Sequence, residues 1–167
     1  GGGTGARSRA RWHVPEGSAA APVTGVASRR WPGGGLGRTP ARGGRQRRPV
    51  GLVMADVDHF KACNGRFGHL AGDVALRAVA SAMQSAMREQ DLVCRFGGEE
   101  FACLMVDADI ETVTRIAERL RALVEALPPR SLGNDRQGIT TSAGLLGCVP
   151  RGDQQPQDLL NRAAGAR

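Results

Sequence analysis

Apolar positions recur in short runs along the chain after Pro49. Residues 52–57 are mostly apolar with an acidic residue near the end, a pattern typical of a buried strand. Residues 92–96 and 101–106 are two more apolar runs on either side of a Gly-Gly pair, which predicts a β-hairpin. Residues 139–146 predict another strand. The longer segments between these strands must then supply the helices.

Two long helices are predicted from apolar residues that recur every three or four positions. The first follows a polar, glycine-containing loop at 64–72, and its apolar positions are Leu76, Val79, Ala80, Met83 and Met87. The second begins near Asp109, a residue type that caps helix N-termini, and Pro128-Pro129 ends it. Its apolar stripe consists of Val113, Ile116, Ala117, Leu120, Leu123, Val124 and Leu127. A last short helix is expected at about 156–164.

The resulting order is β-α-β-β-α-β-α, with one βαβ crossover, a hairpin, and a second helix that returns to a strand. This order predicts the α/β (α+β) fold class, as a ferredoxin-like βαββαβ sheet with helices packed on it. We expect residues 1–20 to be a disordered Gly/Arg-rich tail. Residues 21–167 are expected to form the domain.

Composition separates the first 50 residues from the rest of the chain, whose net charge is +7. They hold ten arginines, one acidic residue (Glu16) and 12 of the 24 glycines, whereas residues 51–167 carry a net charge of −2. Without an apolar period, this Gly- and Pro-interrupted segment is expected to be poorly ordered. The other interpretation is an Arg-rich arm that binds nucleic acid. Because the arginines are scattered and lack an aromatic platform, we favour the poorly ordered segment and expect no nucleic-acid partner.

The four cysteines, Cys63, Cys94, Cys103 and Cys148, include no C-x-x-C pair, so neither a zinc site nor a redox motif is indicated. Cys94 and Cys103 lie in apolar runs and are expected to be small core residues. A reducing compartment fits this pattern. No apolar stretch approaches the ~20 residues of a membrane span, and no apolar segment follows the N-terminal arginines as in a signal peptide. We therefore expect a cytoplasmic chain.

Acidic residues gather where the first strand ends and where the hairpin turns back. Asp56 and Asp58 end the first strand, and Glu99 and Glu100 begin the outgoing strand of the hairpin. If the two strands are neighbours, Asp56 and Glu99 lie side by side. Such oxygen ligands suit Mg²⁺, which is commonly held by one or two carboxylates together with substrate phosphates. Lys61, the only lysine in the chain, could neutralise charge on a transferring phosphoryl group.

The Gly97-Gly98 pair has two interpretations. It could be a tight turn that needs positive φ. It could also be a turn without side chains, so that a nucleotide can approach the backbone. The pair alone is weak evidence. Together with Glu99-Glu100-Phe101 and the preceding Asp56-Val57-Asp58, it is far stronger.

Two motifs in this order and spacing resemble the GGDEF family, the diguanylate cyclases of bacterial second-messenger signalling. The first is Gly97-Gly98-Glu99-Glu100-Phe101. The second runs from Asp56 to Asp73 and is similar to the family's D-x-D-x-F-K-x-x-N-D-x-x-G-H-x-x-G-D, with Gly65 where the family usually has Asp. The segment Ile139–Gly144 also resembles the family's late I-T-x-S-x-G strand. The clear match covers residues 49–164.

The resemblance implies a two-metal phosphoryl-transfer site. Asp56, the backbone carbonyl of Val57, and Glu99 would hold two Mg²⁺ or Mn²⁺ ions. Glu99 would also accept the proton of the attacking ribose 3′-hydroxyl, and Glu100 would support the metal cluster. Lys61 would stabilise the charged transition state. Two such domains, each holding one GTP, would face each other as a homodimer and release pyrophosphate and cyclic di-GMP.

The resemblance also implies the substrate contacts. Asn64, His69 and Asp73 would contact the guanosine of GTP, with Asn64 and Asp73 reading the base edge. His59 and Phe60 would offer backbone N–H groups to the phosphates. Taken singly, Asn64 would be a turn former, His69 a loop residue and Asp73 a charge at a helix start. Their joint spacing after the Asp-Val-Asp run favours the functional interpretation.

Arg88 and Asp91 stand shortly before the hairpin, where they resemble the family's inhibitory product site. There the arginine would fork onto product phosphate or guanine, and the aspartate would accept from guanine. The same pair could instead only end a helix and open a strand. We favour the product site, because arginine suits bidentate contacts with phosphate and guanine.

Both edges of the domain depart from the family pattern. The front, 21–48, resembles the family's D-x-L-T-G-L-x-N-R-R segment, but Ala21 and Ser28 replace its Asp and Asn. Prolines and glycines interrupt the helix that should follow. The family's last helical segment, with its phosphate-contacting Lys and Arg, is expected to be missing. An active cyclase and a catalytically weak or inactive module that binds GTP or cyclic di-GMP are therefore both open.

Overall fold

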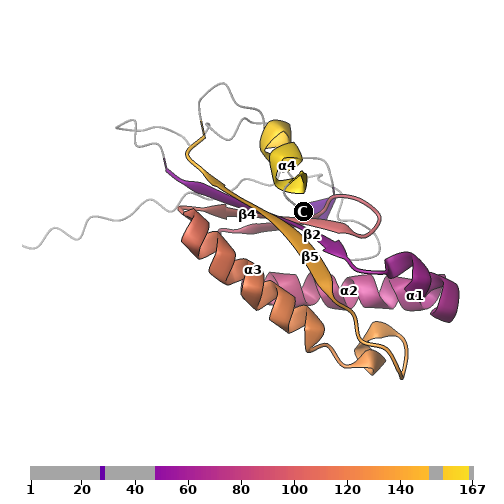
Figure 1. The fold of residues 1–167 in the computed structure, drawn as a ribbon. Coiled ribbons are helices and arrows are strands. Elements are labelled where there is room, and N and C mark those ends of the chain that lie inside the picture. Colours follow the sequence, from indigo (N-terminus) through magenta and orange to yellow (C-terminus); the bar gives the residue numbers. More distant parts are fainter. Residues whose placement is uncertain (1–26, 29–47, 151–155, 166–167) are drawn as a thin grey trace, which may run out of the picture.

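The computed structural model describes residues 27–28, 48–150 and 156–165, and within them a twisted sheet carries helices on both faces (Figure 1). Its strands are β1 (Ala27–Ser28), β2 (Val50–Val57), β3 (Leu92–Arg95), β4 (Glu100–Val106) and β5 (Thr141–Cys148). Its helices are α1 (Phe60–Phe67), α2 (His69–Ala86), α3 (Ile110–Glu125) and α4 (Pro156–Ala164), with a short 3₁₀ helix η1 (Pro129–Leu132).

The strand order across the sheet is β1-β3-β4-β2-β5. The pairs β3–β4, β4–β2 and β2–β5 are antiparallel, and the short β1 runs parallel to β3. Strand β2 is therefore central, with β4 on one side and β5 on the other. Leaving β1 aside, this is the order of the predicted βαββαβ sheet, so the ferredoxin-like fold class is confirmed.

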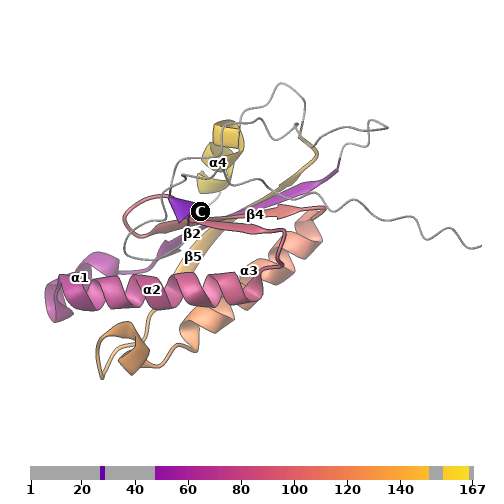
Figure 2. The same cartoon turned by 180° about the vertical axis from the view of Figure 1, so that it is seen from behind.

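Helices α2 and α3 cover one face of the sheet and α4 lies on the other (Figures 1 and 2). The alternation of side chains along each strand separates the two cores. On β2, Val53, Ala55 and Val57 pack toward α2 and α3. Leu52 and Met54 instead pack with Leu159, Leu160 and Ala163 of α4. The same alternation fixes the face of the sheet to which each residue at the end of β2 points.

The predicted loop at 64–72 is wrong, because most of it is helical. Helix α1 continues to Phe67, and α2 begins at His69. A single residue, Gly68, separates the two helices, and its φ of 87° lies in the left-handed region where glycine is at no disadvantage. One glycine is enough to turn the chain, so the polar composition of this stretch did not mark a loop.

Two local expectations from the sequence are confirmed, the helix cap at Asp109 and the buried cysteines. The carboxylate of Asp109 caps α3 by accepting a hydrogen bond from the backbone N–H of Thr112 at 2.9 Å. Cys94 and Cys103 are core residues, and burial raises the pKa of the Cys94 thiol to about 11.

The predicted Gly/Arg-rich tail and most of the front at 21–48 lie outside the described residues. In the described part of the chain, no helix has the length and apolar character to cross a membrane.

Candidate active site

The acidic residues of the two motifs meet where β2 ends and β4 begins, which we call the β2–β4 edge of the sheet. In the β2–β4 ladder, Asp56 lies opposite Glu100, and the backbone N–H of Val57 donates to the carbonyl of Glu99 at 3.1 Å. The register therefore pairs Asp56 with Glu100, one residue beyond the Glu99 that the sequence suggested. By strand alternation, Asp56 and Glu100 point to the face that carries α4. The edge presents oxygen donors from two segments far apart in the sequence.

The glycine turn between β3 and β4 is held by hydrogen bonds to backbone carbonyls. The N–H groups of Phe96 and Gly97 both donate to the carbonyl of Glu100, at 2.8 and 3.2 Å. The guanidinium of Arg95 donates through Nε to the Gly97 carbonyl at 3.1 Å and through Nη2 to the Gly98 carbonyl at 2.6 Å. Sequence reasoning missed Arg95, although an arginine directly before a glycine turn is the signal that could have found it.

The two glycines of this turn differ in their surroundings. A Cβ atom on Gly97 would lie 2.7 Å from Oε2 of Glu100, so Gly97 leaves room for that carboxylate. A Cβ atom on Gly98 would meet nothing within 4 Å. Neither glycine has a left-handed φ, so the turn does not need glycine for its backbone conformation. The space at Gly98 is open.

The turn from β2 into α1 is strained and leaves a helix end uncapped. His59, the N-cap of α1, has φ 55° and ψ 28°, a left-handed conformation that costs a residue with a Cβ about 1–2 kcal/mol. No side chain caps the helix. The first backbone N–H groups of a helix have no partner within it and attract anions. The backbone at Phe60 and Lys61 is therefore suited to phosphate, and the Lys61 side chain is exposed beside it.

Asn64 packs against α2 at Gly72. Its Oδ1 atom is buried without a hydrogen-bond partner in the described part of the protein. A Cβ atom on Gly72 would collide with this Oδ1, so only glycine lets the amide reach this depth. A buried polar atom left unpaired costs about 1–3 kcal/mol, and such atoms are expected where a ligand or water completes the site. Asp73, half-buried, follows Gly72 directly, whereas His69 is exposed at the start of α2.

Asp58 has a clear structural partner set. Its Oδ2 accepts from the Thr140 hydroxyl at 2.7 Å, and its Oδ1 accepts from the Ser142 hydroxyl at 2.6 Å. Its backbone N–H also donates to the Thr140 carbonyl at 2.9 Å. The Ile-Thr-Thr-Ser segment recognised in the sequence thus ties the end of β2 to β5. Sequence spacing alone did not connect these residues.

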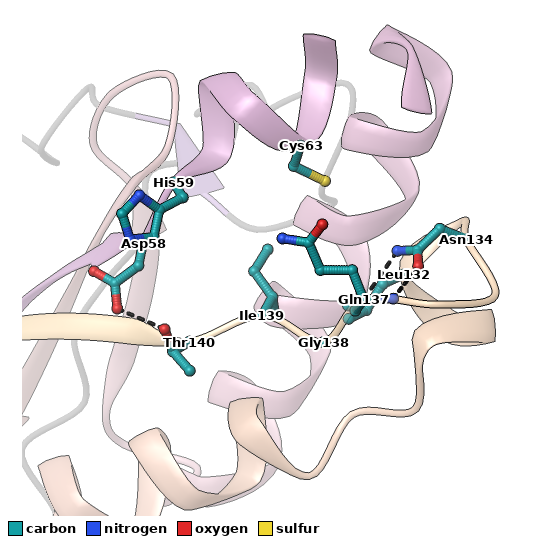
Figure 3. A pocket seen from close by; sticks show the side chains of 9 residues that line it. All are labelled: Asp58, His59, Cys63, Leu132, Asn134, Gln137, Gly138, Ile139 and Thr140. Carbon is teal, nitrogen blue, oxygen red and sulfur yellow. Dashed lines mark hydrogen bonds between the residues drawn. The ribbon is translucent and has the colours of Figure 1, made fainter. Parts of the chain in front are cut away.

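A cavity of about 150 Å³ opens beside this tie (Figure 3). It lies between the start of α1 and the segment that leads into β5, and Figure 3 shows the side chains of Asp58 and His59 at one end. Its lining residues are Asp58, His59, Cys63, Leu132, Asn134, Gln137, Gly138, Ile139 and Thr140. Burial raises the pKa of the Cys63 thiol, so this lining cysteine is a weak nucleophile at neutral pH.

Arg88 and Asp91 lie at the other end of β3 from the glycine turn and bind each other. Arg88 donates through Nε and Nη2 to the two carboxylate oxygens of Asp91, at 2.9 and 3.1 Å. Nη2 also donates to the carbonyl of Val106 at 2.9 Å. The Asp91 side chain is fully buried, while that of Arg88 is 42% exposed. The pair forms a closed connection between the end of α2 and the end of β4.

The structure thus groups the predicted residues in three places. The carboxylates and the glycines share the β2–β4 edge, the remaining substrate candidates lie on α1 and the start of α2, and Arg88 with Asp91 stands apart. Within the described residues, no three His, Cys, Asp or Glu side chains converge as a ready-made metal site. The donors at the edge therefore form a small set and not a closed cage.

Comparison with known proteins gives consistent matches. A family model described as "Diguanylate cyclase, GGDEF domain" matches residues 19–166. The response regulator PleD of Caulobacter vibrioides is 38% identical over 142 residues, which are 84% of this chain and 31% of PleD. The diguanylate cyclase DgcP of Pseudomonas aeruginosa is 39% identical over 124 residues, which are 74% of this chain and 18% of DgcP.

Solved structures agree with these matches. The GGDEF domain of DgcB from Caulobacter crescentus, solved in complex with c-di-GMP, superposes with a TM-score of 0.75 and 29% identity. That match covers 92% of this chain and 90% of the DgcB chain. The diguanylate cyclase SiaD of Pseudomonas aeruginosa, solved with its activator SiaC, gives a TM-score of 0.73 and 35% identity over 87% of this chain and 55% of SiaD.

The antiparallel sheet with helices on both faces and a carboxylate-bearing edge defines a ferredoxin-like α/β domain. The chain belongs to the family of diguanylate cyclase GGDEF domains. It spans about a third or less of the length of the curated relatives described above.

Proposed function

We propose that this chain condenses two molecules of GTP into cyclic di-GMP and releases two molecules of pyrophosphate. The observation that supports this most directly is the β2–β4 register. It pairs Asp56 with Glu100 across the two strands, and the backbone N–H of Val57 donates to the carbonyl of Glu99. These residues come from both motifs that resemble the family.

The residues at this edge fit a hard divalent cation. Their donors are carboxylate and carbonyl oxygens, and Mg²⁺ commonly binds through one or two carboxylates and completes its shell with water and substrate phosphates. Asp56, the Val57 carbonyl and Glu99 would hold two Mg²⁺ or Mn²⁺ ions in this proposal. The ions supply neutralisation of phosphate charge when bound.

The chain's own residues then orient and activate the substrate. The uncapped start of α1, from His59 to Lys61, binds phosphate through backbone N–H groups. Asn64 and Asp73 bind guanine, with His69 beside them. The ribose 3′ oxygen bonds to the α-phosphorus of the partner's GTP, and Glu99 accepts the proton that this hydroxyl loses. The bond from that phosphorus to the bridging oxygen breaks, and pyrophosphate leaves. Lys61 stabilises the charge of this transition state, and Glu100 would support the residues that hold the ions.

A homodimer follows from this chemistry, because each domain supplies one GTP. The two 3′-hydroxyl attacks close the cyclic product only when two copies face each other. Positioning of this kind supplies much of the rate in phosphoryl transfer.

The test is incubation of the protein with GTP and Mg²⁺ or Mn²⁺, with product separated by anion-exchange chromatography. We expect one cyclic di-GMP and two pyrophosphates for every two GTP consumed. The variant Glu99→Gln should lower turnover about 100-fold or more, since it cannot accept the proton. Glu111→Gln, an exposed acid on α3, serves as the matched control and should retain activity. Absence of product from folded wild-type protein would refute the proposal.

Arg88 and Asp91 support a second, compatible role in binding the product. Arg88 already carries the planar fork that binds phosphate and guanine, and it remains partly exposed. In this role cyclic di-GMP competes with the Asp91 carboxylate for the Arg88 guanidinium. Titration calorimetry with cyclic di-GMP should show binding that Arg88→Ala abolishes. If Glu99→Gln retains this binding and the wild type makes no product, the chain is a binding module and not a cyclase.

A further inference from the structure

The turn between β2 and α1 combines strain with the absence of a local restraint. His59 has a left-handed backbone, and no side chain caps the helix that follows. The first hydrogen bond inside α1 runs from the N–H of Cys63 to the carbonyl of His59 at 3.1 Å. A turn of this kind keeps its conformation only when surrounding structure fixes it.

The neighbouring residue, Asp58, supplies that connection from outside the turn. Its two carboxylate oxygens accept from the hydroxyls of Thr140 and Ser142, and its N–H donates to the Thr140 carbonyl. Thr140 directly precedes β5 and Ser142 is its second residue, and both hydroxyls reach the same carboxylate. Figure 3 shows the Asp58–Thr140 hydrogen bond at the end of the pocket that His59 also lines.

We propose that Asp58, Thr140 and Ser142 are positioning residues that hold the left-handed His59 turn, so that the backbone N–H groups at Phe60 and Lys61 face the nucleotide phosphates. Asp58 acts through the two hydroxyls and is not a ligand of metal or substrate. This inference rests on the proposed function for the identity of the anion. It adds a role for a carboxylate and two hydroxyls that the proposed chemistry leaves unused.

The number of bonds makes this role measurable. Both carboxylate oxygens of Asp58 are engaged by hydroxyl donors at short distances, 2.6 and 2.7 Å. Hydrogen bonds to an ionised group are the strong ones, and losing a pair of them corresponds to about a tenfold or larger effect on an equilibrium. The effect should appear in phosphate binding and in the exchange of the amides at the turn.

The experiment compares Asp58→Asn, the double variant Thr140→Val/Ser142→Ala, and the triple variant that combines them. Binding of a non-hydrolysable GTP analogue with Mg²⁺ is measured by calorimetry, and KM and kcat are measured with GTP. We expect the analogue to bind about tenfold more weakly to the double variant and to Asp58→Asn. The triple variant should be no worse than Asp58→Asn by more than about threefold, because residues that act as one unit are not additive.

Conservative variants separate this role from general destabilisation. Thr140→Ser and Ser142→Thr keep the hydroxyls, so each should bind the GTP analogue as the wild type does, with KM within about twofold of the wild-type value. The double variant Thr114→Val/Ser85→Ala removes two hydroxyls that make hydrogen bonds elsewhere, and it should leave binding unchanged. Thermal melting identifies any variant whose loss reflects unfolding.

Hydrogen exchange tests the turn without nucleotide or activity. The amide of Cys63, which donates to the His59 carbonyl, should exchange several-fold faster in Thr140→Val/Ser142→Ala than in the wild type, while amides in the middle of α3 are unaffected. A wild type that makes no product but shows these exchange and binding effects refutes only the proposed cyclase activity. Fully additive losses in the triple variant, or unchanged exchange and binding in the double variant, would overturn the positioning role.

Discussion

Two arginines hold the two ends of the β3–β4 hairpin, and they do so in different ways. At one end, Arg88 binds both oxygens of the Asp91 carboxylate, whose side chain is fully buried, and the carbonyl of Val106. At the other end, Arg95 donates to two neutral carbonyls, those of Gly97 and Gly98. A carboxylate at hydrogen-bonding distance balances the charge of the first arginine, while the described bonds of the second go to uncharged groups.

The difference assigns different tasks to the two ends. A buried carboxylate paired with an arginine is costly to disrupt, so the Arg88 end is built for stability. The Arg95 end fixes a turn with open space at Gly98, and its guanidinium lies on the backbone carbonyls of that turn. Positive charge and fixed backbone at the place where phosphate charge develops are features of phosphoryl-transfer sites. The variants below test this division of roles.

The largest effect is expected for Arg95→Met, which keeps most of the side-chain volume and removes the two bonds to the turn. We expect kcat/KM for GTP to fall about 100-fold, because a shift of about 1 Å in a catalytic group can cost that much. The free energy of unfolding should fall by only about 1 kcal/mol, as for a typical hydrogen-bonding side chain. Steady-state kinetics and urea unfolding measure the two quantities.

Two further variants give the Arg95 experiment its controls. Arg95→Lys keeps the charge but loses the fork, so it should lie between wild type and Arg95→Met. Arg119→Met removes an exposed arginine from the outer face of α3 and should leave both quantities near the wild type. If Arg95→Met lowers stability by several kcal/mol and leaves kcat/KM unchanged, the two ends of the hairpin do not differ in the way described.

Arg88→Met should produce the opposite pattern. It removes both guanidinium bonds from the Asp91 carboxylate, which keeps the bond from the backbone N–H of Arg88 at 3.1 Å, and we expect the free energy of unfolding to fall by about 2 kcal/mol. The value of kcat for GTP should change less than about threefold, since Arg88 lies at the far end of β3 from the glycine turn. Chemical unfolding and initial-rate kinetics at low product concentration measure these quantities.

A double variant tests whether the lost stability comes from the unpaired carboxylate. In Arg88→Met/Asp91→Leu no charge is left buried, and replacing a buried pair by apolar side chains is often close to neutral. The double variant should therefore recover at least half of the stability lost in Arg88→Met. A double variant as unstable as the single one would show that the backbone contact of Arg88 with Val106, and not the ion pair, carries the stability.

The same hairpin indicates how far the sequence alone reaches. Its two apolar runs and the Gly-Gly pair predicted both strands, because these signals lie within one short stretch of chain. The Asp109 cap and the helix at 156–164 were predicted for the same reason. The prediction of a loop at 64–72 was wrong, because a single residue, Gly68, turns the chain between two helices.

The parts of the site that the sequence did not predict depend on pairing between distant segments. A shift of one residue in register exchanges the partner of Asp56 from Glu99 to Glu100, and no local pattern determines that choice. The tie from Asp58 to Thr140 and Ser142 joins residues that are 82 and 84 positions apart. Each motif was visible by itself, but their contact follows only from the sheet order.

The smallest effect is expected at the open side of the turn, in Gly98→Ala. A methyl group there meets no atom within 4 Å, and the backbone of Gly98 has no left-handed φ, so the free energy of unfolding should change by less than about 1 kcal/mol. In the proposed site the methyl group lies where the nucleotide approaches the backbone, so KM for GTP should rise about tenfold.

Gly138→Ala, also in open space but outside the hairpin, should change neither quantity. Gly97→Ala, whose Cβ would lie 2.7 Å from Oε2 of Glu100, should lower kcat as well. If Gly98→Ala instead lowers stability and leaves KM unchanged, the glycine serves the turn alone and the open space has no part in binding.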